Sequence, residues 1–167
     1  SFMGIYFNTG QACNAGSRLF IHEDHYDEVT TALAEKAKGA KVGPGLDAET
    51  MFGAVVSEEQ FERVNGYIAS GLDEGAEPLA GGVAERDGGG YFIHPTLFTG
   101  VMPDMKIARE EIFGPVLAAL SYSSIDEVAE LANDTEYGLA AGIWTRDIGN
   151  AHTLASKLRA GSVYINS

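Results

Sequence analysis

Short apolar runs alternate along this chain with longer segments in which apolar side chains recur every three or four residues. The runs predict buried strands at residues 18–21, 116–122, 139–144 and 162–165. The longer segments predict amphipathic helices that begin near residues 23, 57, 124 and 147. Strands alternating with helices indicate an α/β fold with an open, mainly parallel sheet flanked by helices. Because sites in such sheets form at the carboxyl edge, we expect a site there.

The segment after Ser57 carries the clearest helix signals. Ser57 is an expected N-cap, and Gln60, three residues later, is expected to complete a capping box. The apolar side chains of this helix, Leu72 included, are expected to face the core. Strand-like residues lie on both sides of Pro95, which has no N–H to donate to a sheet. That strand is therefore expected at a sheet edge or at a bend.

Composition fits one compact domain, since 45% of the 167 residues are hydrophobic and 21% are charged. The formal net charge is −13, which argues against nucleic acid and anionic membranes as partners. No apolar run is long enough to span a membrane, and the first residues lack the layout of a signal peptide. A single cysteine excludes an internal disulfide and fits a reducing compartment, so we expect a cytoplasmic protein.

The one cysteine, Cys13, lies between Gly10 and Gly16, where the chain is expected to turn sharply. A nucleophilic thiol must be reachable and partly ionised, and it needs donors near the carbonyl oxygen that it attacks. Arg18 is a candidate source of a positive field for the thiolate. Local chemistry alone favours the opposite interpretation, an inert cysteine buried as a small apolar side chain. The four histidines do not have the spacing of a metal site.

Two motifs favour a nucleophilic Cys13 over an inert one. The stretch from Gly10 to Arg18, GQACNAGSR, resembles the cysteine active-site signature of the aldehyde dehydrogenase superfamily. A second stretch from Glu110 to Val116, EEIFGPV, resembles another signature of the same superfamily. Segments 53–57, 91–97, 133–139 and 160–166 also resemble family segments in the same order, so the resemblance covers essentially the whole chain.

The resemblance implies oxidation of an aldehyde to a carboxylic acid with NAD or NADP. Cys13 would attack the aldehyde to give a thiohemiacetal, hydride would pass to the cofactor, and water would hydrolyse the resulting thioester. Glu111 would bind the ribose hydroxyls on the nicotinamide side, and Phe113 would pack beside the nicotinamide. Glu110 is expected to be a solvated acidic side chain. The implied partner is a small-molecule aldehyde.

The sequence departs from the family pattern in one respect. In the family, an oxyanion-binding asparagine, a glutamate general base and the nucleotide-binding domain precede the cysteine stretch, and an oligomerisation strand follows its last motif. These parts are absent from this sequence. We therefore expect residues 1–167 to be the catalytic domain of a longer, homo-oligomeric enzyme, inactive in isolation, whose cofactor is bound mainly by the absent domain.

Two alternatives remain open at this level. A related acylating enzyme would share the thiol chemistry and pass the acyl group to coenzyme A or phosphate. A short interaction domain that kept the fold would have an unreactive Cys13 and would bind a partner over the surface where the nucleotide-binding domain would sit.

Overall fold

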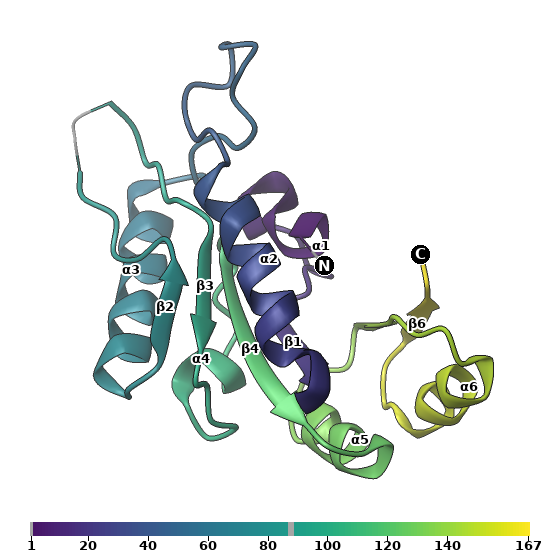
Figure 1. Cartoon of the computed structure of the whole chain (residues 1–167). Coiled ribbons are helices and arrows are strands. Elements are labelled where there is room, and N and C mark those ends of the chain that lie inside the picture. The colour runs from purple at the N-terminus through teal and green to yellow at the C-terminus, as the bar shows by residue number, and fades with distance from the viewer. Residues whose placement is uncertain (1, 87–88) are drawn as a thin grey trace.

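A four-stranded sheet forms the centre of the computed structural model, which describes residues 2–86 and 89–167 (Figure 1). Its strand order is β1-β4-β3-β2. The strands are β1 Arg18–His22, β2 Glu77–Ala80, β3 Thr96–Thr99 and β4 Val116–Tyr122. β4 pairs in parallel with both β1 and β3, whereas β2 pairs antiparallel with β3. The prediction of an open, mainly parallel sheet is therefore confirmed, with β2 as a strand that the sequence pattern did not mark.

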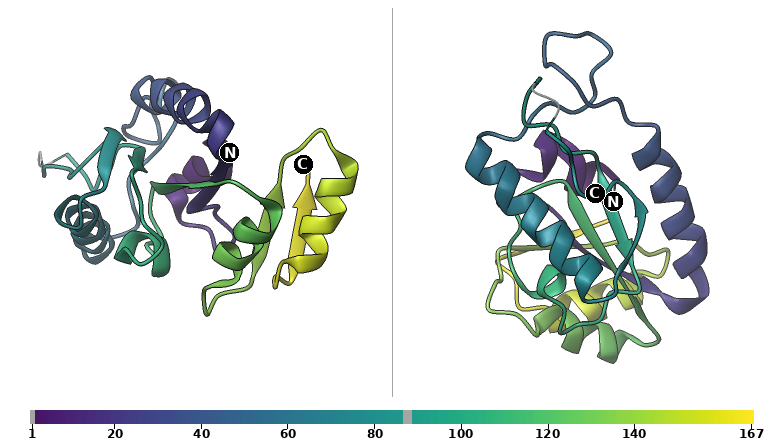
Figure 2. Two further views of the ribbon diagram at one scale, coloured as in Figure 1. Left: turned by 60° about the horizontal axis from the view of Figure 1, so that its bottom comes forward. Right: turned by 90° about the vertical axis from the view of Figure 1, so that its left-hand side faces the viewer.

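Helices cover both faces of this sheet, as the two views of Figure 2 show. Successive residues of β4 belong to different core clusters: Val116, Ala118 and Leu120 pack with α3, and Leu117 and Ala119 pack with α1 and α2. This follows from the strand period of two, because alternate side chains point to opposite faces. The helices are α1 Phe2–Tyr6, α2 Tyr26–Lys38, α3 Glu58–Asp73 and α4 Lys106–Arg109, with short 3-10 helices η1 Phe7–Gly10 and η2 Glu23–His25.

Pro95 lies immediately before β3 and is not in the middle of a strand. Residues 91–93, predicted as strand, have no regular structure, so the strand begins only after Pro95. β3 itself is fully buried between β4 and β2, so the expected edge position was wrong. Pro95 lies before β3, so its missing N–H does not interrupt the pairing of that strand. Leu72 was also predicted to be buried and is 40% exposed, because it lies at the solvent side of the last turn of α3.

The C-terminal residues form a second, smaller unit, seen to the right of the sheet in Figure 1. Its strands β5 Ala140–Ile143 and β6 Ser162–Ile165 pair in parallel as a separate two-stranded sheet. The helices α5 Ile125–Asn133 and α6 Ile148–Lys157 begin at the expected caps: Ser124 accepts from the Glu127 N–H, and Asp147 accepts from the Asn150 N–H. Among the described residues, no helix has the length and apolarity needed to cross a bilayer.

Candidate active site

Cys13 lies at the tip of a tight turn, as predicted. The Ala15 N–H donates to the Ala12 carbonyl at 3.0 Å, which makes Cys13 and Asn14 the central residues of the turn. The thiol-bearing residue is exposed, so the interpretation as a buried, inert side chain is wrong in its premise. Small neighbours and exposure together leave the sulfur accessible to a small molecule.

The backbone just before the turn has an unusual conformation. Asn8, Thr9 and Gly10 have φ values of 51°, 58° and 70°, a run of three left-handed residues. Left-handed backbone is unfavourable for L-residues and most of all for a β-branched one such as Thr9. Local contacts hold the run in place: the Gln11 side-chain carbonyl accepts from the Val56 N–H at 2.9 Å, and the Thr9 hydroxyl lies 3.4 Å from the Gly53 carbonyl oxygen.

Three side chains on one stripe of α3 hold the Glu110–Phe113 segment. Gln60 Nε2 donates to the carbonyls of Ile112 and Phe113, at 3.1 and 2.8 Å. Arg63 donates to the Glu111 carbonyl at 2.7 Å, and the Tyr67 hydroxyl donates to the Glu110 carboxylate at 2.8 Å. The segment is therefore anchored through three main-chain carbonyls and the Glu110 carboxylate, with Phe113 in a left-handed conformation, φ 59°.

These contacts revise the predicted capping box. Ser57 does accept from the Gln60 N–H, at 3.2 Å, so the N-cap is confirmed. The Gln60 side chain, however, reaches the Glu110–Phe113 segment instead of returning to the N-cap. Sequence reasoning did not identify Gln60, Arg63 and Tyr67 as support for the site. Their spacing at i, i+3 and i+7 is the signal of one helix face, but nothing local says what that face contacts.

The two adjacent glutamates have different surroundings. The Glu110 carboxylate is exposed but bonded to Tyr67, and that bond adds to the effect of burial in raising the pKa of the Tyr67 hydroxyl. Glu111 is also exposed, and its carboxylate has no hydrogen-bond or ion-pair partner among residues 2–86 and 89–167. Phe113, two residues further on, leaves 37% of its surface exposed. A free carboxylate and an accessible aromatic face therefore lie on one short segment.

Gly10 packs against Gly114 and so brings the cysteine turn and the Glu110–Phe113 segment together. A Cβ placed on Gly10 would lie 2.0 Å from the Gly114 oxygen and 2.9 Å from the Pro115 nitrogen. Gly114 in turn lies against Val64 of α3, where a Cβ would meet Cγ2 at 2.5 Å. Main chain thus contacts main chain between segments a hundred positions apart in the sequence.

Both segments precede their strands, so the site lies at the amino edge of the sheet. Cys13 precedes β1, and Glu111 and Phe113 precede β4. β1 and β4 are parallel neighbours, with Arg18 opposite Ala118, so the loops before them meet. The expectation of a site at the carboxyl edge was wrong for these residues. That rule applies to loops that follow the carboxyl ends of parallel strands, whereas these two segments precede their strands.

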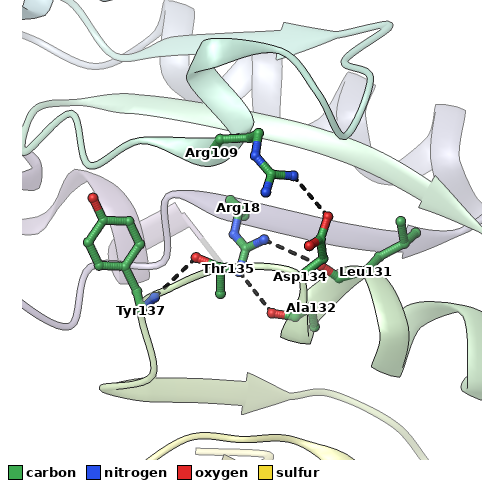
Figure 3. Close-up of polar contacts among 7 residues, drawn as sticks. All are labelled: Arg18, Arg109, Leu131, Ala132, Asp134, Thr135 and Tyr137. Atoms are coloured by element: carbon green, nitrogen blue, oxygen red, sulfur yellow. Dashed lines mark hydrogen bonds and ion pairs between the residues drawn. The ribbon is translucent and has the colours of Figure 1, made fainter.

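The Arg18 guanidinium is not directed at the thiol in this structure. It donates to the carbonyls of Leu131 and Ala132, at 3.5 and 3.1 Å, near the end of α5 (Figure 3). Its donors are therefore directed to α5, and the sequence interpretation of Arg18 as a field for Cys13 is not supported. No group of three or more His, Cys, Asp or Glu side chains able to hold a metal ion occurs in the described part of the chain.

Comparisons with known proteins agree with the two motifs. The model of the Aldehyde dehydrogenase family matches residues 1–167. The mitochondrial aldehyde dehydrogenase of Leishmania tarentolae is 48% identical over 163 residues, which are 98% of this chain and 32% of that protein.

Two solved structures extend the comparison. The NAD+ complex of aldehyde dehydrogenase from Bacillus cereus has a TM-score of 0.94 and 50% identity, covering 99% of this chain and 34% of that one. A point mutant of betaine aldehyde dehydrogenase from Staphylococcus aureus, in complex with NAD+ and with a BME-modified cysteine, has a TM-score of 0.95 and 38% identity, with the same coverage. The chain spans about a third of the length of these relatives.

Proposed function

Because the chain belongs to the aldehyde dehydrogenase family, we propose that residues 1–167 are the catalytic domain of an enzyme that oxidises an aldehyde to a carboxylic acid with NAD or NADP. The observation that carries the proposal is the contact of Gly10 with Gly114, which brings an exposed thiol and a free carboxylate to one edge of the sheet. The intact enzyme would be a homo-oligomer. We assign it to the cytoplasm, since one unpaired cysteine fits a reducing compartment.

Cys13 is the proposed nucleophile. Its sulfur, as thiolate, forms a bond to the aldehyde carbon, and the carbonyl oxygen takes up the electron pair as an oxyanion. The turn places a backbone N–H at Cys13 itself, a donor of the type that stabilises such an oxyanion. The BME-modified cysteine in the Staphylococcus aureus relative supports a reactive thiol in this family.

Glu111 and Phe113 fit one end of a nicotinamide cofactor. An ionised carboxylate without a protein partner accepts two O–H bonds from a ribose, and an accessible aromatic face packs beside a planar ring. Gln60 and Arg63 hold the main chain from which both side chains project, so they orient the pair. When bound, NAD or NADP supplies the hydride acceptor that converts the thiohemiacetal into a thioester. Water then cleaves the carbon–sulfur bond and releases the acid and the Cys13 thiol.

The test uses the enzyme that carries this chain, with a small aldehyde and each cofactor in turn. We expect reduced cofactor and carboxylic acid in equal amounts, and Cys13→Ser is expected to lower kcat by roughly a thousandfold or more. Failure of the unsubstituted enzyme to reduce either cofactor would refute the proposal. An acyl-coenzyme A or acyl-phosphate product in place of the acid would favour the acylating alternative.

The adjacent glutamates provide a matched pair of variants for the cofactor site. Glu111→Gln is expected to raise KM for the cofactor about tenfold, because a charged acceptor of two hydroxyl groups is lost. Glu110→Gln changes the neighbouring side chain, which is also exposed, and keeps an oxygen that accepts from Tyr67, so KM should stay within about twofold. Equal effects of the two substitutions would exclude a specific role for Glu111.

A further inference from the structure

The end of α5 is joined to both segments of the site by arginines. Arg18, five residues after Cys13, donates to the carbonyls of Leu131 and Ala132. Arg109, two residues before Glu111, donates to Asp134 at 2.8 Å. Figure 3 shows both guanidinium groups converging on this helix end from separate elements, Arg18 from β1 and Arg109 from α4.

The same helix end also holds the C-terminal unit. The Asn133 side chain donates to the Lys157 carbonyl at 2.8 Å and accepts from the Arg159 N–H at 2.8 Å. Asn133 therefore ties the end of α5 to the end of α6. Three adjacent positions, 132 to 134, thus connect β1, which follows the cysteine turn, α4, which precedes Glu111, and the end of α6.

The charges at this point are complementary. The last carbonyls of a helix carry partial negative charge, and a guanidinium near them is favourable. Arg109 holds the pKa of the Asp134 carboxyl below its usual range, first by a hydrogen bond and then by its charge. Burial lowers the pKa of Arg18, and the charge of Arg109 lowers it further, while Asp134 opposes that effect. Asp134 therefore compensates two arginines that would otherwise repel each other.

We propose that Arg18 and Asp134 are positioning residues of the active site. Arg18 fixes β1, and with it the Cys13 turn, against the end of α5. Asp134 acts through Arg109 on the segment that presents Glu111 and Phe113. This inference rests on the proposed function, because it assigns the two residues to the two sides of that reaction: Arg18 to the thiol, and Asp134 to the cofactor.

The test is a separation of kinetic effects in the enzyme that carries this chain. Asp134→Asn is expected to raise KM for the cofactor about fivefold with kcat within about twofold, since the exposed ion pair contributes at most a modest free energy. Asp134→Glu, which keeps the charge, should recover most of the loss. Arg18→Met is expected to lower kcat about tenfold with a smaller change in KM for the cofactor, because two carbonyls lose a charged donor.

The chain contains a matched control at the other end of α5. Asp126 pairs with Lys157 at 2.9 Å, and the two cations, Lys157 and Arg109, have the same exposed fraction of 43%. Asp126→Asn should leave both kcat and KM within about twofold. Thermal unfolding of every variant, with Arg18→Lys as a milder second substitution, separates positioning from a loss of folded protein.

The outcomes distinguish the two proposals. If the unsubstituted enzyme is active and Asp134→Asn behaves like Asp126→Asn, the positioning role is overturned and the proposed function stands. Equal losses of kcat and of cofactor affinity in both the Arg18 and Asp134 variants, in proportion to their loss of Tm, also overturn it. An unsubstituted enzyme without dehydrogenase activity overturns both proposals.

Discussion

Replacement of Gly10 by alanine tests the contact that assembles the proposed site. The new Cβ would lie 2.0 Å from the Gly114 oxygen, 2.4 Å from the Gly114 carbon and 2.9 Å from the Pro115 nitrogen. All three are main-chain atoms in a buried segment, so no flexible side chain can move aside. Gly10 also has φ 70°, a conformation that L-residues adopt at a cost.

Two contributions set the magnitude. The left-handed conformation costs an alanine about 1 to 2 kcal/mol. Forcing a methyl group into close-packed main chain costs about 1 to 3 kcal/mol more, through displacement of one segment from the other. We expect Gly10→Ala to lower the free energy of unfolding by about 2 to 5 kcal/mol in total.

Gly100 is the matched control, because it separates the two contributions. It has φ 64°, close to that of Gly10, but a Cβ there would meet no atom within 4 Å. Gly100→Ala should therefore show the conformational cost alone, about 1 to 2 kcal/mol. Urea unfolding followed by circular dichroism measures both free energies, and iodoacetamide alkylation of Cys13 reports whether the turn has shifted.

The difference in free energy of unfolding between the two alanine variants measures the cost of placing a methyl group between Gly10 and Gly114. Equal free energies of unfolding for Gly10→Ala and Gly100→Ala, together with an unchanged alkylation rate of Cys13, would refute the packing of Gly10 on Gly114. The contact of Gly10 with Gly114 would then not be what brings the thiol and the carboxylate together.

Three further predictions concern contacts around the site. Gln60→Ala should cost about 1 to 3 kcal/mol in urea unfolding, since the two main-chain carbonyls that it holds lose their donor; a cost no larger than that of an exposed substitution would contradict this. Ser57→Ala should lower the free energy of unfolding by about 1 kcal/mol, because the N-cap acceptor of α3 is lost. The helix content of the folded protein in the absence of urea should not change. Burial raises the pKa of Tyr6, so the unfolded state ionises first and stability present below about pH 10 is lost as the pH rises. Tyr6→Phe should reduce that alkaline loss, which Tyr26, Tyr67 and Tyr122 share because the pKa of each is also raised. An unaltered pH dependence would exclude Tyr6 as a source.

Much of the fold could be read from local patterns. The helix that follows Ser57, the buried strand at 116–122 and the cap at Asp147 were all predicted, because periodicity and capping depend on residues a few positions apart. The errors occur where the structure depends on residues far apart in the sequence. The strand beside Pro95 was expected at a sheet edge or at a bend, and the actual position of β3, between two partners, depends on strands far away in the sequence.

The candidate site divides in a similar way. The sharp turn at Cys13 was expected from its flanking glycines, and the structure confirms it. Its exposure was not expected from local chemistry, which favoured a buried cysteine. Whether Glu111 binds a ribose stays a prediction. The Glu111 carboxylate is free of partners among the described residues, whereas that of Glu110 is bonded to Tyr67. Two identical residues in a row could not reveal this difference, because Tyr67 lies on a helix far away in the sequence.

The sequence by itself determined the type and order of most helices and strands, although not β2, and the chemical groups available at the two motifs, since these depend on short-range chemistry. Only the tertiary structure decided that the motifs meet at the amino edge of the sheet, that Gln60 supports the second of them and that Arg18 turns to α5. The physical reason is that each of these is a contact between residues far apart in the chain, and its geometry depends on how whole elements pack, which no local pattern specifies.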